Sequence, residues 1–348
     1  MRVAVTGHNG YIGSVMVPFL QKAGHEVVGL DTYLYEDCTF GSDVPDVPSM
    51  RMDLRDVDPR MLAGFDAVIH LAALCNDPLG NQNPATTYDI NHHSSVTLAQ
   101  AAKAAGVSRY IFASSCSLYG LAGDEMLTEE ANFNPITPYG ESKILAERDI
   151  RPLADERFSP VYMRNATAYG VSPRLRCDIV VNNLVGFAYT QGDVLIQSDG
   201  TPWRPLVHVE DISRAFLAAL EAPRDAIHNQ AFNVGRNEDN VRVSEIAEMV
   251  KAVVPNCSIR YAEGGGPDPR SYRVDCGKIL RALPAFQPQW SVSKGVEELY
   301  AAYKAVGLTA EQFQGNKYLR LKQIRKLQDE GRLDGALRWQ DRGAAAQA

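Results

Sequence analysis

Short apolar runs alternate with longer amphipathic stretches along the first half of the chain, and this pattern predicts alternating strands and helices. The predicted strands are Val3–Thr6, Glu26–Leu30, Met50–Leu54, Ala67–Leu71, Tyr110–Ala113 and Pro160–Met163. The helical stretches between them include Tyr11–Ala23, Pro84–Ala105 and Tyr139–Asp155. Continuous apolar strands joined through helices are typical of a parallel sheet with helices on both faces. We therefore predict an α/β fold built on a doubly wound parallel sheet.

The alternation weakens after about Pro173, which indicates a second, smaller domain of mixed α/β type. Its predicted elements are the helices Asp178–Gln191 and Ile212–Glu221 and the short strands Val194–Ile196 and Leu206–Val209. Ala231–Val234 has strand character and is expected to return to the first sheet. We expect residues 1–175 to form the first domain, with a return segment near 228–255, and residues 176–308 to form most of the second. Gly264–Pro267 is expected to be a loop.

The tail over residues 309–348 is charged and helical in character, with Leu319, Ile324 and Leu327 at loosely helical spacing. An amphipathic helix packed on the outside of the protein is favoured over an arm that binds a partner.

Composition narrows the class of protein. A net charge of −7 offers no basic face that would follow nucleic-acid phosphates, and no apolar run approaches the length that crosses a bilayer. The cysteines have no spacing suited to zinc, so no metal site is expected; they are Cys38, Cys75, Cys116, Cys177, Cys257 and Cys276. A reduced, cytoplasmic enzyme is the simplest interpretation.

A glycine-rich turn, Gly7-His8-Asn9-Gly10-Tyr11-Ile12-Gly13, follows the first predicted strand and opens the first predicted helix. Glycines in this context allow a tight turn and a close approach of the backbone to a diphosphate, which the helix N-terminus also attracts. Asp31 ends the second strand, where it can accept hydrogen bonds from an adenosine ribose. Thr32 and Tyr33 follow it without a neighbouring basic residue for a 2′-phosphate, so NAD is favoured over NADP. Asp53 is predicted to contact adenine, with the start of the next turn as its alternative role.

Ser115 closes the fifth strand, at the sheet edge where ligands of such folds bind, and Pro138 opens a helix that carries Tyr139 and Lys143. Four-residue spacing places Tyr139 and Lys143 on one helical face, where an ammonium and a nicotinamide cation favour the phenolate form of tyrosine. The same spacing recurs at Tyr300/Lys304 and Tyr318/Lys322. Since neither has a strand-end serine upstream, both are interpreted as ordinary helix surface.

From Met1 to about Tyr303 the sequence resembles the extended short-chain dehydrogenase/reductase family, in the branch of nucleotide-sugar epimerases and dehydratases. The resemblance rests on TGHNGYIG (6–13), Asp31, HLAA (70–73), Asn91, SSCSLYG (114–120), PYGESK (138–143), RPLVHVEDI (204–212) and the Asp268/Arg270…Asp275 stretch. It implies a Rossmann-type first domain that binds NAD. The cofactor-binding residues implied are Gly7, Asn9, Gly10, Tyr11, Ile12, Gly13, Asp31, Asp53, Leu54, Leu71, Ala72, Ala73, Ser114, Tyr139 and Lys143.

The resemblance also implies roles in chemistry. Tyr139 would be the base for a sugar hydroxyl, Ser115 would hydrogen-bond that hydroxyl, and Lys143 would hold the nicotinamide ribose and lower the pKa of the tyrosine. The substrate-binding residues implied are Cys75, Cys116, Ser117, Thr167, Asn183, Arg204 and Arg270; of these, Asn183, Arg204 and Arg270 match positions that grip the nucleotide diphosphate.

Departures from the family pattern separate the possible reactions. 4,6-Dehydratases have an Asp–Glu pair just after the catalytic Ser or Thr, whereas Cys116 and Ser117 stand here, so elimination lacks a general acid. Thr167 replaces a substrate-contacting Asn. A 3,5-epimerase of the family uses a cysteine one position later than Cys116, so a catalytic role for Cys116 stays open beside that of a small strand-end residue. Arg174 and Arg176 are weak candidates to meet a uronic-acid carboxylate.

Together these observations predict an NAD-dependent epimerase of a nucleotide-activated sugar. We expect it to act at C4 through a transient 4-keto intermediate, with tightly bound NAD. The alternatives are a reductase, a dehydratase or a 3,5-epimerase on the same scaffold and, more remotely, a non-catalytic nucleotide sensor. A homodimer through the helices Pro84–Ala105 and Tyr139–Asp155 is expected from the resemblance, as is a nucleotide-diphosphate sugar as the ligand.

Overall fold

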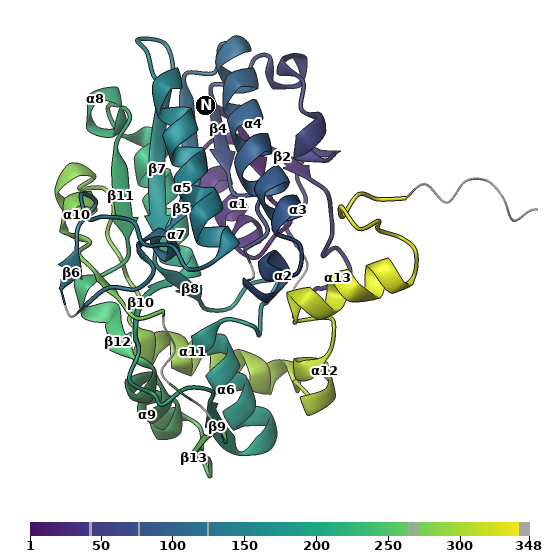
Figure 1. Cartoon of the computed structure of the whole chain (residues 1–348), viewed down its shortest axis with the longest axis vertical. Helices are drawn as coiled ribbons and strands as arrows, with labels where there is room; N and C mark the ends of the chain where they lie inside the picture. The colour runs from purple at the N-terminus through teal and green to yellow at the C-terminus, as the bar shows by residue number, and fades with distance from the viewer. Residues whose placement is uncertain (42–43, 76, 124, 264–265, 267–269, 341–348) are drawn as a thin grey trace, which may run out of the picture.

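A seven-stranded parallel sheet organises the first part of the chain (Figure 1). The computed structural model describes residues 1–41, 44–75, 77–123, 125–263, 266 and 270–340. The strand order is β11-β7-β5-β4-β1-β2-β3, and every neighbouring pair is parallel. The strands are β1 (Arg2–Thr6), β2 (Glu26–Asp31), β3 (Ser49–Arg51), β4 (Ala67–His70), β5 (Arg109–Ser115), β7 (Ser159–Asn165) and β11 (Ala231–Val234).

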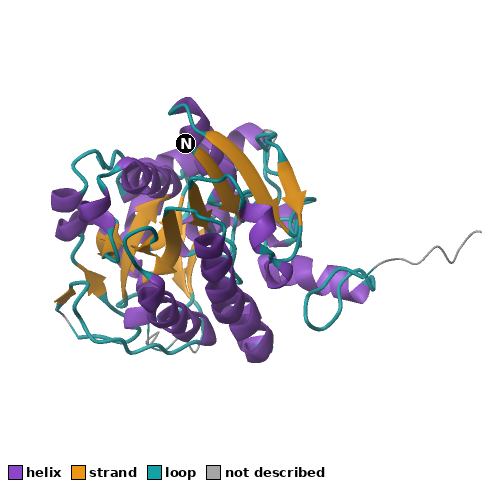
Figure 2. Ribbon diagram, turned by 90° about the horizontal axis from the view of Figure 1, so that it is seen from above, coloured by secondary structure: helices purple, strands orange, loops and turns teal. Residues whose placement is uncertain are grey.

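Helices cover both faces of this sheet, which the continuous apolar strands predict (Figure 2). On one face lie α1 (Gly13–Lys22) and α7 (Val209–Glu221), whose apolar side chains share a core cluster with Val3 and Val5. The other face packs α4 (Ser94–Ala104) and α5 (Pro138–Ile150) against alternate strand residues such as Ala4. The predicted doubly wound α/β fold is confirmed, and so is the return of β11 to the main sheet.

The predicted strand Met50–Leu54 is shorter in the structure. β3 ends at Arg51, and Asp53 accepts a hydrogen bond from the Arg55 amide at 2.9 Å, which starts a turn of 3₁₀ helix at Leu54.

The predicted helix Pro84–Ala105 is confirmed as a continuous helical run, α3 (Pro84–Tyr88) followed by α4, with a turn of π-helix at Asp89–His93 between them. Asn91 lies in this turn, fully buried, and its amide exchanges hydrogen bonds with the backbone N–H and C=O of Leu74 at 2.7 and 3.0 Å. Insertions of this kind re-aim a side chain at functional sites. Here the inserted turn fixes the loop that follows β4.

A second group of elements lies beyond the carboxyl ends of the main strands (Figure 1). Its core contains α6 (Val180–Gln191), α9 (Val243–Val253) and α11 (Val292–Val306), so within 228–255 only β11 joins the main sheet. The other strands form small sheets, and they are β6 (Met126–Leu127), β8 (Thr167–Tyr169), β9 (Asp193–Ile196), β10 (Trp203–His208), β12 (Asn240–Arg242), β13 (Ser258–Tyr261) and β14 (Arg273–Val274). The short helices are α2 (Asp77–Gln82), α8 (Arg224–Ile227) and α10 (Gly277–Ala282). The predicted loop at Gly264–Pro267 falls largely outside the described residues, and Asp268 falls wholly outside them.

The tail forms α12 (Ala310–Gln314), α13 (Arg320–Asp329) and a final loop closed by an antiparallel bridge between Leu333 and Trp339. It folds back beside the residues that follow β2 and β3 (Figure 1). In the described part of the chain, no helix has the length and apolar character to cross a bilayer, and no group of three His, Cys, Asp or Glu side chains is placed to hold a metal ion.

A buried ion pair fixes helix α5 against the sheet. Arg164 of β7 donates two hydrogen bonds to the Glu147 carboxylate, at 3.0 and 2.8 Å, and both side chains are only 2% exposed. Ser114, at the end of β5, donates a third hydrogen bond to Glu147 at 2.6 Å. These contacts join the helix that carries Tyr139 and Lys143 to two neighbouring strands.

Replacing Glu147 by Gln is expected to lower the free energy of unfolding by about 3–5 kcal/mol, because the Arg164 guanidinium stays buried without a counter-charge. Urea unfolding followed by tryptophan fluorescence measures this change. Arg148→Gln is the matched control, since it breaks an exposed ion pair with Asp149 on the same helix and should change stability little. Equal effects of the two substitutions would contradict the role given to the buried pair.

Candidate active site

A cavity of about 740 Å³ lies at the carboxyl ends of the main strands, where the second group of elements faces the sheet. Most residues predicted for the site line it. They are Gly7, Asn9, Gly10, Tyr11, Ile12, Gly13, Asp31, Leu71, Ala72, Ala73, Cys75, Ser114, Ser115, Ser117, Tyr139, Lys143, Thr167, Asn183, Arg204 and Arg270. Asp53, Leu54 and Cys116 are not among its lining residues.

The glycine turn brings backbone against backbone at the base of this cavity. A Cβ atom on Gly13 would lie 2.3 Å from the carbonyl oxygen of Gly7, and one on Gly7 would lie 2.8 Å from the Ala72 nitrogen. Gly7 also has a φ of +71°, which favours glycine. The turn therefore leaves room for a phosphate group beside the backbone N–H groups at the start of α1. Its shape fits the diphosphate of a dinucleotide.

Asp31 lies beside this turn with its carboxylate oriented by the backbone. Its two oxygens accept hydrogen bonds from the amides of Asn9, at 3.0 Å, and Tyr33, at 2.7 Å. Arg51 stands opposite Asp31 in the β2–β3 register, a basic neighbour that the residues following Asp31 do not indicate. Its guanidinium pairs with Glu36 and stacks 4.6 Å from the Tyr33 ring centroid, so it is already engaged by protein groups. The arrangement agrees with a ribose that carries no 2′-phosphate.

The structure does not support the prediction that Asp53 and Leu54 contact the cofactor. The Asp53 carboxylate accepts hydrogen bonds from both the backbone and the guanidinium of Arg55, and Arg338 of the tail lies 3.9 Å away. Leu54 is buried in the core under the sheet. Asp53 thus has the alternative role foreseen for it, as the residue that begins a turn, because two arginines occupy its oxygens.

Ser115, Tyr139 and Lys143 meet in the cavity. Thr137 caps α5 by accepting a hydrogen bond from Gly140, and Pro138 occupies the first helical turn, which places Tyr139 at the start of the helix. Ser115 and Tyr139 line the cavity together, and the Ser115 side chain acts to lower the pKa of the Tyr139 phenol. Lys143 lies one turn further along, with its Nζ 5.8 Å from the centroid of the Tyr139 ring. The three residues therefore form one constellation, as the sequence predicts.

The pKa values of Tyr139 and Lys143 differ from what the sequence leads us to expect. Burial raises the pKa of Tyr139, and the nearby Cys75 thiol and Asp77 act in the same direction, whereas Ser115 and Arg176 oppose them. Burial also lowers the pKa of Lys143 to about 8, and its Nζ donates a hydrogen bond to the carbonyl oxygen of Ala113 at 2.8 Å. Burial outweighs the groups that lower the pKa of Tyr139, so the phenol keeps its proton until further positive charge enters the cavity.

Cys116 points into the core. Its side chain is fully buried, and its Sγ donates a hydrogen bond to the carbonyl oxygen of Arg164 at 3.1 Å. Burial raises the thiol pKa well above its ordinary value. The prediction that Cys116 contacts substrate is therefore not supported, because the 3₁₀ turn after Ser115 presents Ser117 to the cavity instead. A small strand-end residue is the role that the structure gives to Cys116.

Basic side chains also line the cavity. Arg176 forms an ion pair with Asp178 and donates a hydrogen bond to the Cys75 thiol at 3.0 Å. Arg270 pairs with Asp77 at 2.9 Å, so it bridges the second group of elements to the start of α2. Arg204 and Asn183 line the same cavity. The structure thus brings together all the residues that the family pattern assigns to a nucleotide diphosphate.

The sequence interpretation missed Arg320 and Tyr272, which also line the cavity. Arg320 lies four and seven residues before Ile324 and Leu327, so it occupies the apolar face of its helix, and this position was the signal that could have identified it. The interpretation of Tyr318 as helix surface is wrong. This residue precedes α13 and is buried in the second core, where its carbonyl oxygen accepts a hydrogen bond from the Cys177 amide.

Comparison with known proteins identifies the family of this chain. Residues 3–235 match the NAD dependent epimerase/dehydratase family. The chain belongs to this family. As an epimerase/dehydratase family member it is 29% identical over 280 residues to a UDP-glucose 4-epimerase of Neisseria meningitidis serogroup C, a match that covers 72% of this chain and 81% of that protein. A UDP-glucose 4-epimerase of Bacillus subtilis (strain 168) is 26% identical over 327 residues, which are 86% of this chain and 95% of that one.

A solved structure extends the comparison to bound ligands. MoeE5 in complex with UDP-glucuronic acid and NAD superposes with a TM-score of 0.74 and 28% sequence identity, over 88% of this chain and 99% of that chain. NAD is thus the cofactor of this family member, and it fits the glycine turn and Asp31. Those residues would hold its diphosphate and adenosine ribose, while Ser115 and Tyr139 stand at the opposite end of the same cavity.

Replacing Gly13 by Ala is expected to reduce the NAD content of the purified protein by about tenfold or more. The added Cβ displaces the Gly7 carbonyl and the backbone N–H groups, and charge-assisted hydrogen bonds to a phosphate are worth about 1.5–3 kcal/mol. Enzymatic assay of released NAD measures the content, and circular dichroism checks that the variant folds. Gly123→Ala, where a Cβ meets nothing within 4 Å, is the control. Full NAD content in folded Gly13→Ala protein would contradict the assignment of the glycine turn to the diphosphate of NAD.

Proposed function

We propose that this chain is an NAD-dependent epimerase that inverts C4 of a nucleotide-activated sugar through a transient 4-keto intermediate. The observation that carries the proposal is the constellation of Ser115 and Tyr139 in one cavity with the glycine turn, and with no carboxylate at positions 116 and 117. Relatives named UDP-glucose 4-epimerase support it, as does the MoeE5 structure, which contains UDP-glucuronic acid. A UDP-sugar is accordingly the first substrate to test.

Each residue of the site has a separate role in the proposed reaction. Ser115 and Tyr139, which line the same cavity, hold the hydroxyl on the reacting carbon between their oxygens. NAD, when bound, supplies a hydride acceptor and a positively charged ring. With that charge present, the Tyr139 phenol can lose its proton to solvent, and the resulting phenolate can accept the proton of the sugar hydroxyl and return it after the sugar has turned over. Arg204 and Arg270 grip the diphosphate, so the sugar can rotate without leaving the cavity.

Other reactions on this scaffold fit the cavity less well. A 4,6-dehydratase needs a carboxylic acid beside the sugar, and Ser117 occupies the place where one would stand. A 3,5-epimerase needs an accessible acid or base, whereas the Cys116 thiol lies in the core. We further propose that NAD is held tightly and that the protein works in the cytoplasm as a homodimer through α4 and α5; this part rests on the family resemblance.

Incubation with UDP-, GDP-, TDP-, CDP- and ADP-sugars in deuterated water, without added NAD, tests the reaction by NMR. A C4 stereoisomer without deuterium in the sugar is expected, because the hydride returns to the carbon that it left. Deuterium at C3 or C5, or loss of water, would identify a different reaction and overturn the proposal. Net oxidation or reduction with exchanging cofactor would overturn it as well.

Replacing Tyr139 by Phe is expected to lower kcat by about 10²–10⁴-fold, the usual contribution of a positioned acid–base group, while the NAD content stays unchanged. Steady-state kinetics and the NAD assay measure the two quantities on one preparation. Tyr300→Phe is the matched control, because this tyrosine also precedes a lysine by four residues but lies on α11 and packs against Tyr189. Undiminished activity of Tyr139→Phe would remove the basis of the mechanism.

A further inference from the structure

The C-terminal arm, residues 309–340, lies against the wall of the cofactor cavity. Ile324, Leu327, Leu333 and Leu337 of the arm share a hydrophobic cluster with Leu34, Leu74 and Leu79. The last three residues also line the cavity. The arm is therefore more than an outer layer, because it supports a wall that contacts bound ligand.

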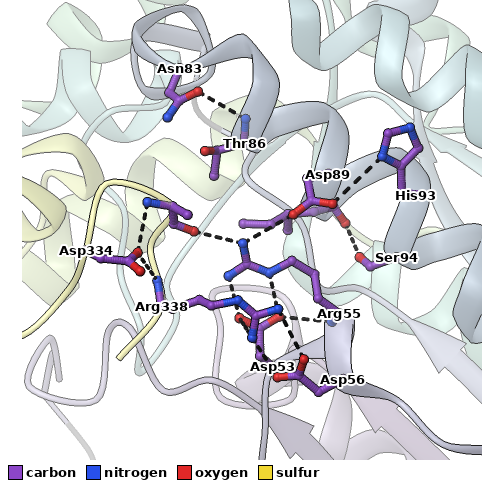
Figure 3. A network of polar contacts seen from close by, with 12 residues as sticks. Asp53, Arg55, Asp56, Asn83, Thr86, Asp89, His93, Ser94, Asp334 and Arg338 are labelled. Atoms are coloured by element: carbon purple, nitrogen blue, oxygen red, sulfur yellow. Dashed lines mark hydrogen bonds and ion pairs between the residues drawn. The ribbon is translucent and has the colours of Figure 1, made fainter. Parts of the chain in front are cut away.

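Polar contacts tie the end of the arm to the residues that follow β3 (Figure 3). Arg338 pairs with Asp56 through two contacts, at 2.7 and 3.1 Å, and Arg55 donates a hydrogen bond to the carbonyl oxygen of Ala336 at 2.9 Å. The Trp339 indole donates to the carbonyl oxygen of Thr32, next to Asp31, at 2.6 Å. The arm is thus anchored beside the residue that faces the adenosine ribose.

Arg320, at the start of α13, reaches from the arm into the cavity lining. Only 4% of it is exposed, and its guanidinium carbon lies 4.1 Å from the centroid of the Tyr35 ring. Its Nη2 donates a hydrogen bond to the carbonyl oxygen of Arg174 at 2.7 Å. Its Nη1 is buried and has no hydrogen-bond partner among the described residues. A buried guanidinium with an unused donor is costly unless a ligand completes it.

The charges around Arg320 favour the binding of an anion. Arg176 is neutralised by Asp178, but Arg174 and Arg320 form no ion pair with any carboxylate in the described part of the chain. Arg174 instead binds Asn9 in the glycine turn, at 2.9 Å to the side chain and 3.2 Å to the backbone. Arg174 therefore links Arg320 to the turn that fits a diphosphate, through its backbone carbonyl at one end and its guanidinium at the other. Both arginines are buried, and of the two Arg320 lines the cavity.

We propose that Arg320 is a cofactor-binding residue, whose guanidinium donates hydrogen bonds to the diphosphate of NAD. The C-terminal arm carries this charge to a site that the turn, Asp31 and Asn9 otherwise build from the first residues of the chain. Bound NAD then has a contact on the arm as well as on the sheet, and its dissociation is slowed. The inference rests on NAD binding and not on which sugar reacts, so a failed epimerase assay leaves its test intact.

The test compares the NAD dissociation rate of Arg320→Gln with that of Arg325→Gln. Arg325 is an exposed arginine on the same helix, so the control removes an equal charge outside the cavity. Holoprotein is diluted into NAD-free buffer. At timed intervals, samples are passed through a gel-filtration column, and the NAD that remains bound to the protein is assayed. Arg320→Gln is expected to lose NAD about tenfold faster or more, since it removes a charge-assisted hydrogen bond to phosphate. Arg325→Gln should match the wild type.

Arg320→Lys separates binding from packing, because it keeps the charge but loses the planar fork. Its dissociation rate should lie between those of the wild type and Arg320→Gln, and it carries the test if the glutamine variant does not fold. Equal rates for Arg320→Gln and Arg325→Gln would overturn the proposal. So would a lysine variant as fast as the glutamine variant with both less stable to urea, which is the result of a packing role.

Calorimetric titration of the holoprotein with UDP distinguishes the two diphosphates that enter this cavity. UDP affinity should be the same in Arg320→Gln, Arg325→Gln and wild-type protein. A loss of UDP affinity in Arg320→Gln with unchanged NAD dissociation would assign Arg320 to the sugar nucleotide and overturn its assignment to the cofactor.

Discussion

The buried ion pair between Glu147 and Arg164 is the interaction on which the geometry of the site depends. Helix α5 carries Tyr139 and Lys143, and Glu147 lies one turn beyond Lys143 on the same helix. Arg164 also donates hydrogen bonds to the Tyr119 hydroxyl and the Glu129 carbonyl, so a single guanidinium connects α5, β7 and the segment after β5. Because both charges are out of water, the pair holds only in one arrangement, and the catalytic helix has a defined position relative to Ser115.

The cavity carries basic side chains although the chain as a whole is acidic. The chain carries a net charge of −7, yet Arg176, Arg204, Arg270 and Arg320 all line one cavity. Within a partly buried site such charges act over short distances and are screened little by salt, so the cavity attracts diphosphates despite the acidic surface. Net charge correctly argues against nucleic acid, but it gives no indication of the ligand that the cavity binds.

The parts predicted correctly from sequence depend on neighbours along the chain. Strand and helix positions follow from the spacing of apolar residues, and the strand–turn–helix at Gly7–Gly13 needs only its own glycines and the strand before it. The predicted helix Pro84–Ala105 is present, but the sequence does not indicate its π turn at Asp89–His93, which is stabilised by Asn91 reaching the distant Leu74 backbone. Local propensity cannot report such a contact.

By itself the sequence determined the doubly wound sheet, the cofactor turn and the Ser115–Tyr139–Lys143 constellation, because each is encoded by residues at short, fixed spacing. Only the tertiary structure decided that Asp53 is occupied by arginines, that Cys116 faces the core, and that Arg320 lines the cavity. These outcomes depend on residues that lie far apart in sequence: Arg338 approaches Asp53, and Arg320 bonds to Arg174. Such contacts form only when the arm folds back on the sheet. The spacing of apolar residues along the chain does not specify the position that the arm then takes.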